Sequence, residues 1–116
     1  MNKAISSLLA ISLFLASLQC QAQEYGKLDG TYAIKSATLI DPPSNEKKDR
    51  IVMIIKGNAA KDMYDEIPAK AKKSKCDAEM LLKIAGNLAC TKESNFYTCN
   101  VAILLRTGET ASALVC

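Results

Sequence analysis

The alternation of apolar and polar residues along the chain predicts mainly β-strands. From Thr31 to Ile40, every second side chain falls on one face, namely Tyr32, Ile34, Ser36, Thr38 and Ile40. Two prolines follow at Pro42 and Pro43, and a proline cannot donate a hydrogen bond to a neighbouring strand. The next segment, Ile51–Lys56, begins with five consecutive apolar residues and predicts a central strand that is covered on both faces.

One segment, 58–67, has the spacing of an amphipathic helix. Its apolar residues recur every three or four positions and form one stripe: Ala60, Met63, Tyr64 and Ile67. Asn58 is a residue type that caps helices by accepting a hydrogen bond from a first-turn amide, and Pro68 cannot sit inside the helix. A helix of about ten residues is not stable alone. We therefore expect it to pack on a sheet.

The segment 77–85 is compatible with either a helix or a strand. A helix would place Leu81, Ile84 and Ala85 on one side, whereas a strand would alternate Met80, Leu82 and Ile84 with polar residues. Gly86-Asn87 is a suitable two-residue hairpin turn before Leu88, and this favours the strand.

The C-terminal part predicts two further strands, 96–106 and 110–116. A polar turn at 92–95 precedes the first of them, and a turn at 107–109 joins the two. The expected fold class is therefore α+β: a small antiparallel meander of about five strands with one short helix packed on it.

The first 22 residues are typical of a cleaved secretory signal peptide. Lys3 precedes an apolar stretch that ends at Leu18 and is too short to span a bilayer. A cleavage site with small residues at −3 and −1 follows, namely Cys20 and Ala22. A lipid anchor at Cys20 is disfavoured, because a lipoprotein signal has a leucine and a small residue where this chain has serine and glutamine. We expect a single domain, 23–116, that is exported to the periplasm or secreted.

Cleavage would leave an even number of cysteines, which predicts two disulfides in an exported domain: Cys76, Cys90, Cys99 and Cys116. If the turn at 107–109 aligns the last two strands, Cys99 lies beside Cys116. We therefore favour Cys99–Cys116 with Cys76–Cys90. The second possibility is Cys90–Cys99 with Cys76–Cys116, and the third pairing also stays open. A zinc site is disfavoured, since the chain has no histidine and no closely spaced cysteine pair.

The sequence lacks the residues that several catalytic and ligand-binding motifs require. Without histidine, neither a Ser-His-Asp triad nor its cysteine counterpart can form, and no phosphate-binding or dinucleotide-binding glycine motif is present. The charge is nearly balanced and aromatic residues are few, which is atypical of nucleic-acid binding. Three carboxylates, Asp62, Asp65 and Glu66, are the remaining catalytic candidates, and a small hydrolase would use Asp62 or Glu66. A solvated helix face explains them better, so we expect no catalytic residue and no cofactor.

The candidate binding residues lie in loops. The turn at 106–109 presents Arg106, Thr107 and Glu109, and Phe96 stands at the preceding turn. Four lysines, Lys70, Lys72, Lys73 and Lys75, form either a basic patch or a solvated linker. The favoured function is binding of another protein, as an inhibitor or immunity protein would do. The alternative is an envelope-associated module that binds a small anion or a cell-wall fragment through the four lysines.

Overall fold

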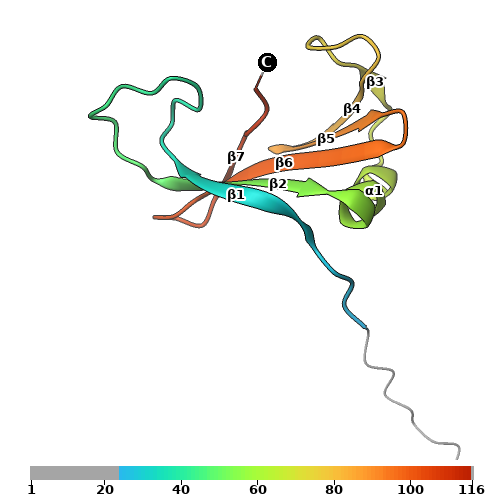
Figure 1. The fold of residues 1–116 in the computed structure, drawn as a ribbon, viewed down its shortest axis with the longest axis horizontal. Coiled ribbons are helices and arrows are strands. Elements are labelled where there is room, and N and C mark those ends of the chain that lie inside the picture. Colours follow the sequence, from blue (N-terminus) through green and yellow to red (C-terminus); the bar gives the residue numbers. More distant parts are fainter. Residues whose placement is uncertain (1–23, 116) are drawn as a thin grey trace, which may run out of the picture.

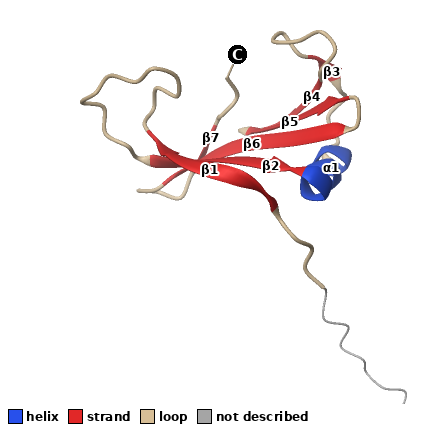
Figure 2. Cartoon of the chain, viewed as in Figure 1, coloured by secondary structure: helices blue, strands red, loops and turns tan. Residues whose placement is uncertain are grey.

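In the computed structural model, which describes residues 24–115, seven strands form one antiparallel sheet and one helix packs against it (Figures 1 and 2). The elements follow the order β1 (Asp29–Lys35), β2 (Arg50–Lys56), α1 (Gly57–Glu66), β3 (Lys72–Lys73), β4 (Leu81–Ala85), β5 (Leu88–Glu93), β6 (Phe96–Leu104) and β7 (Thr110–Ala111). The expected signal peptide, its cysteine Cys20, and Cys116 lie outside the described residues. The α+β class is confirmed, although two short strands, β3 and β7, raise the strand number above five.

The strands are not arranged as a simple meander. Their order in the sheet is β1-β2-β6-β5-β4-β3, with β7 also paired to β6. The helix carries the chain from the end of β2 across the sheet, and β3 then pairs with β4 at the far edge. Strand β6 is therefore the central strand of the sheet, since it pairs with other strands along both of its edges. One of its edges pairs with β2, and its other edge is divided between β5 and β7.

The first strand is shorter than the alternation predicts, because it ends at Lys35 rather than Ile40. Thr38 instead closes the loop that connects β1 to β2. Its backbone amide and its hydroxyl donate hydrogen bonds of 2.6 and 2.9 Å to the Glu46 carboxylate. The partner strand begins only at Arg50, so residues beyond Lys35 have no strand to pair with.

The helix has the predicted stripe but a different start. Ala60, Tyr64 and Ile67 are buried, and Met63 packs against them. The N-cap residue is Lys56, without a side-chain hydrogen bond, so the expectation that Asn58 caps the helix is wrong. The chain turns sharply at Gly57, where φ is 69°, and Asn58 is already inside the first turn.

The strand alternative for 77–85 is confirmed over Leu81–Ala85, and the Gly86-Asn87 hairpin aligns Ala85 with Leu88. Residues 77–80 form a turn instead. The amide of Glu79 donates to the Asp77 carboxylate, and the amide of Met80 donates to the Asp77 carbonyl oxygen.

The cysteine pairing that we favoured is wrong, because Cys90 is bonded to Cys99. The two residues lie directly opposite each other on β5 and β6. Strand β7 pairs only with Ala102 and Ile103 and cannot extend toward Cys99, because β5 already occupies that part of the β6 edge. The expected strand 110–116 is consequently two residues long. Of the second possible pairing, the Cys90–Cys99 half is confirmed.

The core lies where the helix meets the sheet. Cys90 and Cys99 are fully buried there, and the Sγ atom of Cys99 lies 3.5 Å from the carbonyl oxygen of Ala60. Tyr64 packs edge-on against Tyr97, with 5.5 Å between the ring centroids. Three small side chains outside this cluster are also buried: Ala89 and Ala102, on the face of the sheet opposite Cys90 and Cys99, and Ala113 in the C-terminal tail.

Candidate functional site

The four lysines of 70–75 are all exposed. Lys72 and Lys73 form β3, so this segment is not a plain linker. With Lys75 they line a shallow cavity of about 310 Å³, which also includes the apolar side chains Leu82, Ile84 and Leu114. Lys70 lies outside the lining of this cavity.

The two predicted contact loops stand at opposite ends of β6. Residues 105–109 form a tight turn in which Leu104 and Glu109 are joined by a backbone hydrogen bond of 2.8 Å, and Arg106, Thr107 and Glu109 are exposed. Phe96, which is 80 % exposed, begins the same strand. A strand of that length spans roughly 26 Å. The structure therefore does not bring Phe96 and the 106–109 turn into one site.

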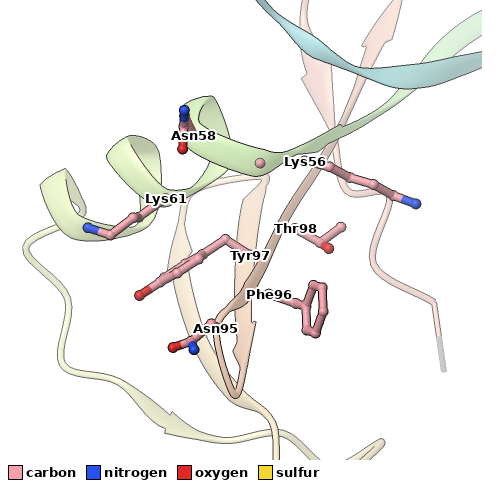
Figure 3. Close-up of a pocket in the computed structure, with 8 residues that line it drawn as sticks. Lys56, Asn58, Lys61, Asn95, Phe96, Tyr97 and Thr98 are labelled. Carbon is pink, nitrogen blue, oxygen red and sulfur yellow. The ribbon is translucent and has the colours of Figure 1, made fainter.

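Phe96 borders a different cavity, which the sequence did not reveal. A cavity of about 560 Å³ lies between the start of α1 and the β5–β6 turn. Figure 3 shows the residues that line it. Its lining includes Lys56, Asn58, Lys61, Asn95, Phe96, Tyr97 and Thr98. These residues come from segments about forty positions apart, so no local pattern groups them. Lys61 is partly neutralised here, because its ammonium donates a 2.7 Å hydrogen bond to Asp65.

The three candidate carboxylates remain on the exposed side of the helix. The hydrogen bond from Lys61 lowers the pKa of Asp65 below its usual value, and the same bond raises the pKa of Lys61. Asp62 lines a cavity of about 430 Å³ with Lys27 and Asp29, and Glu66 does not. That cavity therefore does not join Asp62 to Glu66.

A further apolar surface lies on the sheet itself. Two rows of side chains cross β1, β2 and β6 on the face that also carries α1: Tyr32–Met53–Val101 and Ile34–Ile51–Ile103. We call these six residues the open face. The helix covers the neighbouring row, at Ile55 and Cys99, and Figure 2 shows it at one end of the sheet.

No member of the open face is buried. Tyr32 is 72 % exposed and Ile34 is 41 % exposed, while the other four are half-buried. The expectation that 51–56 is covered on both faces is therefore wrong for the part of β2 that includes Ile51 and Met53. The alternating pattern identified the shared face, but the position of the helix depends on the turn at Gly57, which no hydrophobic pattern determines.

Comparisons with known proteins identify no relative: the chain matches no family model, and no curated protein or solved structure is significantly similar to it. Within residues 24–115, no helix has the length and apolar character needed to cross a membrane. In the same residues, no three side chains of His, Cys, Asp or Glu gather closely enough to hold a metal ion.

Proposed function

We propose that this chain is an exported, non-catalytic protein that acts by binding another protein through the open face. The observation that carries the proposal is the set of six neighbouring apolar side chains, drawn from three strands, with none of them buried. Contiguous apolar surface of this kind marks interaction sites, because burying it on a partner releases ordered water. The partner surface it fits is itself apolar, since no charged side chain interrupts the two rows.

Two further features support a binding role over a catalytic one. The sequence contains no histidine, and the cavity that Asp62 lines includes neither Asp65 nor Glu66. A rigid sheet that is stapled at Cys90–Cys99 presents a preorganised surface, which lowers the entropic cost of association. An inhibitor or an immunity protein that blocks an enzyme of the cell envelope has these properties.

The test compares what immobilised wild-type and variant proteins retain from an envelope extract. Ile103→Thr and Met53→Thr each remove apolar surface from the open face, and Phe96→Ser removes an exposed ring that lies outside it. A partner bound through the open face is retained by the wild type and by Phe96→Ser and is lost from the other two. Equal retention by all four proteins would overturn the proposal.

We further propose that a second disulfide joins Cys76 to Cys116. Because Cys90 and Cys99 are bonded to each other, neither of them can pair with Cys76 or Cys116. Leu114, two residues before Cys116, lines the same cavity as Cys76, so the tail runs toward that cysteine. Peptide mapping without reduction tests this: a Cys76–Cys116 peptide is expected, and a Cys116 peptide that alkylates without reduction contradicts it.

Binding of a small anion or an anionic cell-wall fragment is the second candidate function. It is favoured by the cavity where Lys72, Lys73 and Lys75 adjoin apolar side chains. Replacing these three lysines and Lys70 with serine would then abolish binding of such a fragment. Unchanged binding would rule out this segment as the site.

A further inference from the structure

The outer edge of β1 is the long free edge of the sheet. Among residues 24–115, strand β1 pairs with β2 alone, and all of its seven residues are paired on that side. No other described strand pairs with its outer side. The opposite edge of the sheet ends in the two-residue strand β3. Long free edges invite pairing with another strand and are usually blocked by proline or by a charge in mid-strand. Residues 30–34 contain neither.

We propose that two copies of this chain pair through β1, antiparallel and centred on Tyr32. In this register, Tyr32 faces its counterpart, and all seven residues of each β1 find a partner. In an antiparallel pair, residues opposite each other point to the same face of the sheet. For two identical strands related by a two-fold axis perpendicular to the sheet, this holds only if the axis passes through a residue position rather than between two residues. The result is one continuous sheet through both copies.

The charges at the two ends of β1 match this register. Asp29 of one copy would lie opposite Lys35 of the second copy, and the same contact would recur at the other end. Among the described residues, neither side chain forms an ion pair within its own chain. Lys35 lies opposite Arg50 of β2, whose guanidinium is already paired with Asp49 at 2.8 Å. A carboxylate from the second copy would give Lys35 the ion pair that it lacks among the described residues of its own chain.

The side chains along β1 also fit this register. Ile34 of one copy would lie opposite Gly30 of the other. Gly30 cannot carry a side chain, because a Cβ there would overlap the Ile54 carbonyl oxygen. A hollow of about 190 Å³ lies around it, bordered by Tyr32, Met53 and Ile55 among others. The exposed Ile34 side chain of the second copy fits over this hollow. The pairing would also join the open faces of the two copies into one longer apolar surface.

Charge reversal gives a test with an internal control. The protein expressed from the full sequence should show a concentration-dependent monomer–dimer equilibrium by sedimentation equilibrium. Asp29→Lys and Lys35→Asp should each weaken the dimer by about tenfold, since two exposed ion pairs become repulsive. The double variant Asp29→Lys/Lys35→Asp restores both pairs and should restore the dimer. A wild type that stays monomeric at millimolar concentration, or a double variant no better than the singles, would overturn the proposal.

A cysteine at the two-fold axis gives a second, independent readout. Side chains directly opposite across antiparallel strands have Cβ atoms about 4.5–5.5 Å apart, near the separation that a disulfide spans. Tyr32→Cys should therefore form a covalent dimer under mild oxidation. Phe96→Cys, equally accessible but remote from β1, should not. Equal cross-linking of the two variants would contradict the pairing.

This dimer does not depend on the proposed partner. Ile103→Thr, which should abolish partner binding, changes no residue of β1 and should leave the dimer intact. A dimer that forms normally while the envelope extract yields no partner would support this inference and count against the proposed function alone.

Discussion

Cys90 and Cys99 lie directly opposite each other on β5 and β6, with their Cα atoms 4.0 Å apart and their sulfur atoms bonded. Both residues are fully buried beneath α1. The bond thus joins the β5–β6 hairpin in the core rather than tying down a terminus. It also fixes the part of the sheet on which the helix packs.

Removing this bond should destabilise the domain substantially. The double variant Cys90→Ala/Cys99→Ala releases a ten-residue loop, for which the chain-entropy model gives about 2.7 kcal/mol, and leaves space under the helix. We expect the urea midpoint to fall accordingly when unfolding is followed by circular dichroism. An unchanged midpoint would show that the helix–sheet core is stable without the bond.

Lys83 holds the end of the helix from a neighbouring strand. Its ammonium donates hydrogen bonds of 3.1 and 3.2 Å to the carbonyl oxygens of Tyr64 and Ile67, and it lies 4.6 Å from the centroid of the Tyr64 ring. These carbonyl oxygens carry the partial negative charge of the helix C-terminus. Lys83→Met should therefore lower the free energy of unfolding by about 1–2 kcal/mol.

Lys92 provides the control for this prediction. It also lies near a tyrosine ring, 5.6 Å from the centroid of Tyr97, but donates no hydrogen bond to a helix carbonyl within the described part of the chain. Lys92→Met should change the free energy of unfolding by less than about 0.5 kcal/mol. Equal losses from the two variants would assign the effect of Lys83 to its ring contact alone.

Glu46 should make the β1–β2 loop sensitive to acid. The hydrogen bonds from the Thr38 amide and hydroxyl lower the pKa of Glu46 below its usual value of 4.5. A carboxylate with a lowered pKa stabilises the folded loop above its unfolded pKa, and this contribution is lost as the pH falls through the folded value. The protection factors of the amides in residues 36–49, which are corrected for the intrinsic pH dependence of exchange, should therefore fall below pH 4.5.

A side-chain titration by NMR tests the cause. Thr38→Val removes the hydroxyl donor and should move the pKa of Glu46 back toward 4.5, while Thr107→Val, which removes a hydroxyl that accepts from the Glu109 amide instead, should leave it unchanged. If Thr38→Val had no effect, the hydroxyl would play no part in the shift.

The sequence predicted the elements that depend on local periodicity. The stripe of Ala60, Tyr64 and Ile67 and the hairpin at Gly86-Asn87 are both present. The sequence-based prediction failed where segments distant in sequence compete for the same strand edge. Strand β5 excludes β7 from the edge of β6 beside Cys99. Aligning the last two strands about the turn at 107–109 cannot detect that competition. The prediction also failed at the open face, because the extent of cover depends on the turn at Gly57 that directs the helix over Cys99.

The most direct measurement of the binding proposal is the affinity of the captured partner for wild-type, Ile103→Thr and Phe96→Ser proteins by titration calorimetry. If the open face is the binding surface, Ile103→Thr should weaken binding by about tenfold or more and make the heat-capacity change less negative, because less apolar surface is buried. Phe96→Ser should bind as the wild type does. An Ile103→Thr protein that binds with unchanged affinity and heat-capacity change would contradict the account.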